Sequence, residues 1–150
     1  PAYAGIPLTH RLFGSTVTFI TGQEDEKKLL SSVDWKRFAP GTDTLVFFMG
    51  SKNLPEITSA LIANGRNRET PTTVIRWGTR PEQEVVSGKL HNISKKASSL
   101  GPPVIIVVGE VTRLREKLNW FENLPLFGQR IIITRAREQA KILSDALARL

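Results

Sequence analysis

Residues 44–50 read Thr-Leu-Val-Phe-Phe-Met-Gly and place four consecutive large apolar residues ahead of a methionine and a glycine. A continuous apolar run of this length is typical of a strand that is buried on both faces, as in sheets covered by helices. Asn53 and Pro55 follow and predict the start of a helix. Because ligands of open α/β sheets bind at the carboxyl ends of strands, we expect Met49 and Gly50 to lie at a ligand-binding edge. A core strand that simply ends in a turn is the alternative.

Two other apolar stretches end in the same way. Residues 104–108 are five β-branched residues in a row and precede Gly109, and the strand expected over 72–77 ends at Trp77 and precedes Gly78. Glycine permits a flat ligand to approach the backbone closely, although it also begins ordinary turns. We expect the three strand ends together to border one ligand cleft.

The remaining pattern predicts one α/β domain with a mixed sheet and packed helices, followed by the start of a second domain. Strands are expected at 16–21, 44–49, 72–77, 84–89 and 104–108, and helical segments at 34–39, 54–64, 90–100 and 113–122. Gly88 marks the strand at 84–89 as an edge strand or a bulge.

The last part of the chain has a different organisation. Residues 123–128 are interpreted as a linker, and a strand at 130–134 and a helix at 136–150 then form a βα unit with no following strand to pair with. We therefore expect residues 1–122 to form one domain and residues 129–150 to open a second domain that is cut short. The chain also lacks an initiator methionine, which indicates a piece of a longer protein.

Composition excludes several classes of protein. The chain has 150 residues, 40% of them hydrophobic, and no apolar run approaches the roughly 20 residues of a membrane span. The absence of cysteine excludes disulfides, thiolate nucleophiles and thiolate metal sites, and with only His10 and His91, far apart in sequence, we expect no metal site.

The net charge of +7 favours an anionic partner, either nucleic acid or a polycarboxylate or phosphate ligand. The basic residues are scattered and form no stripe with aromatic residues, so we expect no nucleic-acid binding. Within the loop-like segment 1–15, Arg11 is the candidate contact for a carboxylate, because its planar guanidinium suits one. A solvated loop is the alternative for this segment.

Several motifs, taken in order, resemble one family. They are PAYAGIPLTHR at 1–11, VTFITG at 17–22, TLVFFMG at 44–50, RWGTRPEQ at 76–83, VVGEV at 107–111 and LREKLNW at 114–120. The residues of these motifs and their order are similar to those of the second lobe of uroporphyrinogen-III C-methyltransferases, within the tetrapyrrole methylases. The tail LFGQRIIITRAR at 126–137 resembles the start of a uroporphyrinogen-III synthase, and a natural fusion of the two enzymes would explain both the linker and the incomplete unit.

The resemblance implies a function. Members of this family transfer methyl groups from S-adenosylmethionine to two ring carbons of uroporphyrinogen III, which gives precorrin-2 for sirohaem and cobalamin synthesis. It further implies a cytoplasmic homodimer of two-lobed subunits, with the cofactor between the lobes. By their match to the family's motifs, Met49 and Gly78 are the expected cofactor contacts, and the end of the strand near Gly109 is expected to border the same cleft. Arg11 is the expected contact for the eight carboxylates of the substrate.

Some features depart from the family pattern. Phe48 stands where the family usually has tyrosine, and Gln23 stands where histidine is common. Gln23 belongs to the charged stretch 22–32, which we expect to be exposed. The glycine-rich loops and the acidic residue to which the family assigns proton abstraction belong to the first lobe, so the catalytic residues are not in this chain. We expect that the chain alone neither methylates nor binds the cofactor tightly.

Three alternatives stay open at this point. The chain can belong to a precorrin methylase that acts later, to a non-catalytic dimerisation domain, or to a basic nucleic-acid-binding module. A steep fall of nucleic-acid affinity with salt would identify the last of these.

Overall fold

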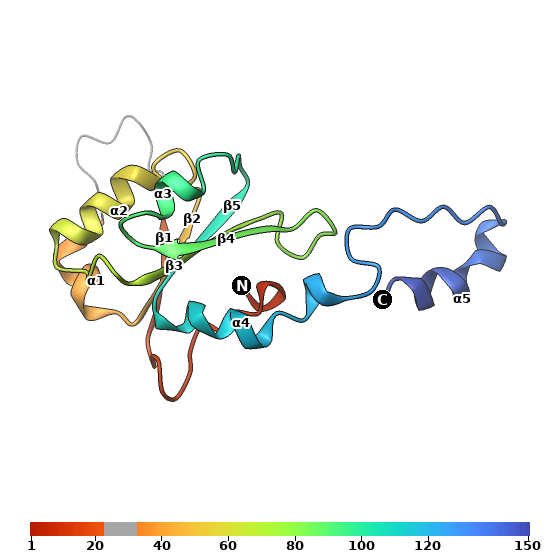
Figure 1. The fold of residues 1–150 in the computed structure, drawn as a ribbon, viewed down its shortest axis with the longest axis horizontal. Coiled ribbons are helices and arrows are strands. Elements are labelled where there is room, and N and C mark those ends of the chain that lie inside the picture. The colour runs from red at the N-terminus through yellow and green to blue at the C-terminus, as the bar shows by residue number, and fades with distance from the viewer. Residues whose placement is uncertain (23–32) are drawn as a thin grey trace.

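The computed structural model describes residues 1–22 and 33–150, and it contains a five-stranded sheet covered on both faces (Figure 1). The strands are β1 (Val17–Thr21), β2 (Thr44–Phe48), β3 (Pro71–Arg76), β4 (Glu84–Lys89) and β5 (Val104–Val108). Gln23 and most of the stretch 22–32 lie outside the described residues, so the expectation of an exposed charged segment is not tested there.

The sheet is mixed, as expected. Its order is β1-β2-β5-β3-β4, in which β1 and β2 are parallel and every other neighbouring pair is antiparallel. Because β2 and β3 both run antiparallel to the central strand β5, their carboxyl ends lie at one edge of the sheet together with the start of β5. We call this the cleft edge. The edge formed by the starts of β2 and β3 and the end of β5 is the opposite edge.

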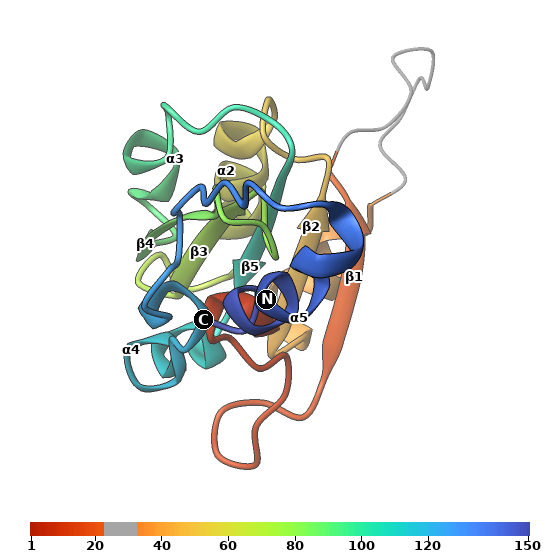
Figure 2. The ribbon, with the colours of Figure 1, turned by 90° about the vertical axis from the view of Figure 1, so that its right-hand side faces the viewer.

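Helices cover the two faces unequally (Figures 1 and 2). One face carries α1 (Trp35–Gly41), α2 (Leu54–Ala63) and α3 (Ile93–Lys96). The other carries the short 3₁₀ turns η1 (Ala2–Ala4), η2 (Glu110–Leu114) and η3 (Phe121–Asn123), together with α4 (Arg115–Leu118). No helix among the described residues is long and apolar enough to cross a membrane.

Strand β2 is buried on both faces, which confirms the prediction from its apolar run. Its residues alternate between the two cores, because Leu45 and Phe47 pack beneath the helices while Val46 packs beneath the 3₁₀ turns. The first four residues of β2 are at most 1% exposed. Strand β4 is the last strand in the order of the sheet, which confirms the prediction from Gly88 that it is an edge strand.

Two predicted helices are shorter than expected. Instead of a helix over 90–100 there is only the four-residue α3, because the N–H of Leu90 is still bonded to the carbonyl of Thr70 and that of His91 to Arg68. The helix predicted over 113–122 is divided into η2, α4 and η3, with an extended backbone at Asn119 (ψ 97°). There the indole of Trp120 donates to the carbonyl of Ala2, so tertiary contacts override the local periodicity.

The strand predicted at 130–134 is wrong. These residues form no ladder with any other described residue, and a strand exists only through its pairing. They lead instead into α5 (Arg137–Leu147), which Figure 1 shows lying away from the sheet. The helix itself confirms the prediction for this part of the tail, although it ends before Leu150.

Candidate functional site

A cleft of about 890 Å³ lies at the cleft edge of the sheet. Residues from four segments line it, namely 1–3, 48–52, 75–83 and 102–105. Phe48, Ile75 and Ile105 form an apolar floor, and the sheet register brings them together because Ile105 pairs with both. This arrangement suits a ligand with a flat apolar part.

The turns after β2 and β3 are strained in the same way. Met49 (φ 54°), Trp77 (φ 50°) and Thr79 (φ 77°) are the non-glycine residues of the described chain that have a positive φ, and all three line the cleft. Such a backbone costs an L-residue about 1–2 kcal/mol. Strain of this kind persists only where surrounding contacts enforce it, and it is concentrated at functional sites.

Close backbone packing enforces the turn after β2. The N–H of Gly22 donates to the carbonyl of Phe48 at 2.6 Å, and the amide of Asn53 donates to the carbonyl of Gly22 at 3.0 Å. A Cβ on Gly50 would lie 2.8 Å from Cδ1 of Ile106. Gly50 therefore fits this position because it has no side chain. The hydrogen bonds around Gly22 hold the chain in its turn directly after Met49.

The loop after β3 is held by its own side chains. The N–H of Arg80 donates to the carbonyl of Trp77 at 3.1 Å, and the guanidinium lies 4.8 Å from the centre of the Trp77 ring. The N–H of Thr79 donates to Oε1 of Gln83 at 3.0 Å. These contacts fix the indole and the strained residues of the loop as one wall of the cleft.

The cleft offers a ligand both backbone donors and positive charge. Among the described residues nothing accepts a hydrogen bond from the N–H of Met49 or of Gly78. Lys52 and Arg80 are the charged side chains among the lining residues, and no carboxylate lines the described cleft. The site is therefore suited to a partly apolar ligand that also carries acceptor atoms or negative charge.

The predicted cofactor contacts lie together. Met49 and Gly78 come from different strands and both line the cleft, which is what the cofactor-site prediction requires. Arg11 does not line it. Arg11 sits in the turn closed by the N–H of His10 donating to the carbonyl of Gly14, and Gly14 packs against Asp43 just ahead of β2, at the opposite edge.

The expectation that Gly109 borders the same cleft is wrong. Strand β5 runs antiparallel to β2 and β3, so its carboxyl end lies at the opposite edge. There the N–H of Gly109 donates to the carbonyl of Pro71 at 2.9 Å. The start of β5, in particular Ile105, could not be recognised from the sequence, because local patterns carry no information about strand direction. Nor was Gln83 recognised as a residue of the site.

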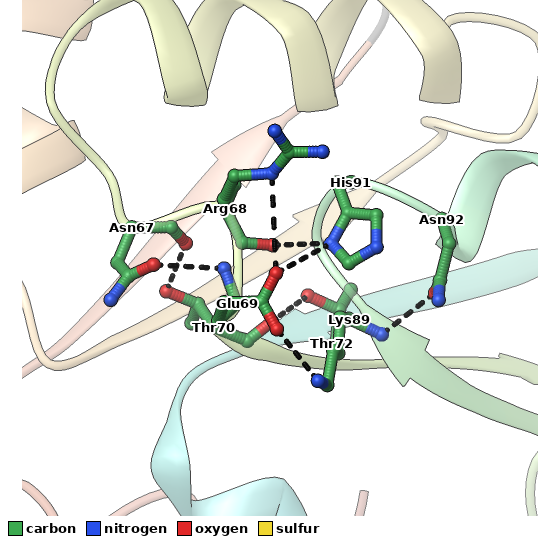
Figure 3. Close-up of polar contacts among 8 residues, drawn as sticks. All are labelled: Asn67, Arg68, Glu69, Thr70, Thr72, Lys89, His91 and Asn92. Atoms are coloured by element: carbon green, nitrogen blue, oxygen red, sulfur yellow. Dashed lines mark hydrogen bonds and ion pairs between the residues drawn. The ribbon is translucent and has the colours of Figure 1, made fainter.

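Figure 3 shows a cluster of polar side chains at the opposite edge. Glu69 contacts Lys89 Nζ at 2.6 Å and His91 Nδ1 at 3.2 Å, and the hydrogen bond from Lys89 lowers the pKa of the Glu69 carboxyl. The cluster connects the loop before β3 to the end of β4. Within the described residues no group of three or more His, Asp or Glu side chains is arranged to hold a metal ion.

Comparison with known proteins places the chain in a family. The sequence profile of the Tetrapyrrole (Corrin/Porphyrin) Methylases matches residues 1–94. The uroporphyrinogen-III C-methyltransferase of Bacillus subtilis (strain 168) is 39% identical over 149 residues, which are 98% of this chain and 31% of that protein. A siroheme synthase of Photorhabdus laumondii is 44% identical over 120 residues, 80% of this chain and 25% of that protein.

A solved structure agrees. The uroporphyrin-III C-methyl transferase of Thermus thermophilus, complexed with S-adenyl homocysteine, matches with a TM-score of 0.65 and 27% identity over 75% of this chain and 49% of that one. The chain thus spans between a quarter and a third of the curated relatives named above, and about half of this solved one. On the strength of the profile match and these relatives, the chain belongs to the tetrapyrrole methylase family.

Proposed function

We propose that this chain is the second lobe of a uroporphyrinogen-III C-methyltransferase that uses S-adenosylmethionine, and that the cleft is its half of the cofactor site. The observation that carries the proposal is the pair of strained turns at Met49 and Trp77–Thr79, which line the cleft beside its apolar floor and in which the N–H groups of Met49 and Gly78 meet no acceptor among the described residues. The Thermus relative complexed with S-adenyl homocysteine supports the same ligand class.

The residues of the cleft fit this cofactor. Phe48, Ile75 and Ile105 offer apolar contact for an adenosine ring system, and the N–H groups of Met49 and Gly78 can donate to its acceptor atoms. When bound, S-adenosylmethionine supplies a methyl group on a positively charged sulfur. The contribution of this lobe is to hold that ligand in one orientation. Holding two reactants in the right geometry lowers the barrier of a bimolecular transfer.

The substrate proposed is uroporphyrinogen III, and positive charge supports it. Lys52 and Arg80 lie at the cleft, and the chain as a whole carries a net charge of +7. Both features favour a polycarboxylate. Arg11 remains a proposed substrate contact, and from its place at the opposite edge it would meet a carboxylate only beyond the cleft itself.

The proton-abstracting group is proposed to lie on another part of the protein. The described cleft is lined by no Asp, Glu or His side chain that could accept a proton. The chain also spans only 31% of the Bacillus relative and 49% of the Thermus relative. We therefore assign to this chain binding and orientation, and to the rest of the enzyme the acid–base step.

The domain organisation is part of the proposal. Residues 1–122 form the lobe, residues 123–128 the linker, and residues 129–150 the start of a synthase-like domain fused behind it. The alignment with the Bacillus enzyme, which includes 98% of this chain, supports a tail that belongs to the same polypeptide. A cytoplasmic homodimer is proposed on the family resemblance.

Calorimetric titration with S-adenosylhomocysteine tests the proposal. The full-length protein is expected to bind the ligand, and the 150-residue chain alone to bind it weakly or not at all, because the cleft supplies one wall of the site. Failure of the full-length protein to bind would contradict the proposed function. Micromolar binding by the 150 residues alone would contradict the two-lobed site.

A further inference from the structure

The side chain of Gln83 connects two walls of the cleft. It is only 6% exposed, and both atoms of its amide are used. Oε1 accepts the N–H of Thr79 at 3.0 Å, while Nε2 donates to the carbonyl of Tyr3 at 3.2 Å and to Oε1 of Glu122 at 2.7 Å. Thr79 and Tyr3 line the cleft from segments far apart in sequence.

A second layer of hydrogen bonds holds Gln83 in turn. Oε2 of Glu122 accepts from the guanidinium of Arg115 and, at 3.4 Å, from the amide of Asn119. Arg115 also donates to the carbonyl of Ala4 at 2.7 Å. Both ends of the network therefore return to the N-terminal segment, and its central ion pair is largely buried, with side chains 16% and 19% exposed.

The network has the form of a fixed support. Burial alone would raise the pKa of Glu122, but the hydrogen bonds from Arg115 and Gln83 outweigh it and the pKa is lowered, so the carboxylate stays charged and keeps accepting. An amide at position 83 supplies one acceptor and two donors, and this geometry uses all three. Of the other side chains only that of asparagine carries the same amide, and it is one methylene shorter.

We infer that Gln83 is a positioning residue for the cofactor, which acts by holding the strained loop 77–79 against the N-terminal segment. The inference rests on the proposed function and extends it to a residue that does not itself need to touch the ligand. Its role is to keep Thr79 in its left-handed conformation, and with it the neighbouring N–H of Gly78, in the geometry that the ligand meets.

Replacement by methionine separates positioning from packing. Gln83→Met keeps the volume and removes all three hydrogen bonds, so the full-length enzyme is expected to bind S-adenosylhomocysteine about tenfold more weakly. The KM for S-adenosylmethionine should rise similarly, while kcat at saturation changes less than about twofold. Glu84→Gln is the matched control, because Glu84 is the next residue and its side chain makes, among the described residues, only the exposed ion pair with Arg76.

An exchange of the two groups provides the rescue. Gln83→Glu alone places a second carboxylate against Glu122 and is expected to weaken binding more than Gln83→Met. The double variant Gln83→Glu with Glu122→Gln restores an acceptor for Thr79 and a donor between positions 83 and 122. The donor to the carbonyl of Tyr3 is not restored, so affinity should recover only in part, to a value above that of Gln83→Glu alone and below that of the unmodified enzyme.

Hydrogen exchange reports the support without any ligand. In full-length Gln83→Met the amide of Thr79 should exchange faster than in the Glu84→Gln control. Faster exchange with unchanged affinity, or a fall in kcat with unchanged KM, would overturn the inference. If the unmodified enzyme does not bind S-adenosylhomocysteine, the proposed function fails, and that result is recognised without any variant of Gln83.

Discussion

The two edges of the sheet differ in how their polar groups are satisfied. At the opposite edge, the carboxylate of Asp43 accepts the N–H groups of Ser15 and Thr16 and the Thr16 hydroxyl. Nearby, Arg66 donates to the carbonyls of Ala39, Thr42 and Asp43. Through these bonds, the polar groups of this edge are paired with one another within the protein.

The cleft edge leaves groups open. Its turns carry three non-glycine residues in the left-handed region, and the N–H groups of Met49 and Gly78 meet no described acceptor. One edge therefore stabilises the fold, while the other keeps strained turns and N–H groups that meet no described acceptor. The contrast predicts that substitutions at the opposite edge change stability, whereas those at the cleft edge change affinity.

The largest effect is expected at Gly109. Its φ is 150°, and an added Cβ would lie 2.6 Å from the backbone oxygen of Asp43, so Gly109→Ala should lower the free energy of unfolding by about 2–3 kcal/mol. Gly78→Ala is the matched change at the cleft edge, where the nearest atom is Cγ2 of Ile75 at 3.3 Å. It should cost less than about 1 kcal/mol.

Urea denaturation measures both glycine variants, and titration with S-adenosylhomocysteine measures their affinities. Gly78→Ala should bind more weakly than the unmodified full-length protein, while folded Gly109→Ala should bind normally. Equal losses of stability at the two glycines would remove the proposed distinction between the edges.

Two arginines give the next largest effect. Arg66→Ala removes hydrogen bonds to three carbonyls and should lower the free energy of unfolding by about 2 kcal/mol. Arg80→Ala removes an exposed cation over Trp77 and should change stability by less than about 1 kcal/mol. Thermal and urea unfolding test this.

For substrate binding we expect the larger effect from the substitution of Arg80 and the smaller effect from that of Arg66. Arg80→Ala should raise the KM for the polycarboxylate substrate in full-length enzyme, and Arg66→Ala should not. Arg11→Gln, measured beside them, decides whether the predicted contact at Arg11 operates. A KM that is raised by Arg66→Ala but not by Arg80→Ala would contradict the division between the edges.

A smaller effect is expected at Met49. Glycine adopts its φ of 54° without strain, so Met49→Gly should leave the free energy of unfolding unchanged or raise it by up to about 1 kcal/mol. The variant loses apolar contact in the cleft and should bind S-adenosylhomocysteine about fivefold more weakly. Stability and affinity that fall together would show that Met49 is structural.

The smallest effect is a pH dependence at the opposite edge. The hydrogen bonds from Ser15 and Thr16 lower the pKa of Asp43 in the folded protein. Its contribution to stability is therefore complete above the unfolded-state pKa of about 3.9 and is lost as the pH falls through the lower folded-state value. Asp43→Asn should remove this part of the acid-induced loss, measured by unfolding between about pH 2 and pH 5. Identical pH profiles would contradict it.

The sequence predicted the strands of the sheet well, and the comparison of two apolar stretches shows the limit. Residues 104–108 and 130–134 are both rich in β-branched residues, but only the first becomes a strand, because β2 and β3 lie on either side of it. Local propensity identifies a segment that can pair. It does not supply the partner.

The lining of the cleft was predicted in part for the same reason. Met49 and Gly78 follow apolar strands and could be recognised by their motifs, whereas the exclusion of Gly109 depends on the direction of β5. Gln83 acts through Tyr3 and Glu122, which are distant in sequence, so no local pattern could identify its contacts.

Photoaffinity labelling tests whether the cleft is the cofactor site. The full-length protein is labelled with an azido-adenosine analogue of S-adenosylhomocysteine, digested and analysed by mass spectrometry. Label is expected on segments 48–52 or 77–80 and should be suppressed by excess S-adenosylhomocysteine. Label that competes with S-adenosylhomocysteine but spares both segments would contradict the assignment of the cleft as the cofactor site.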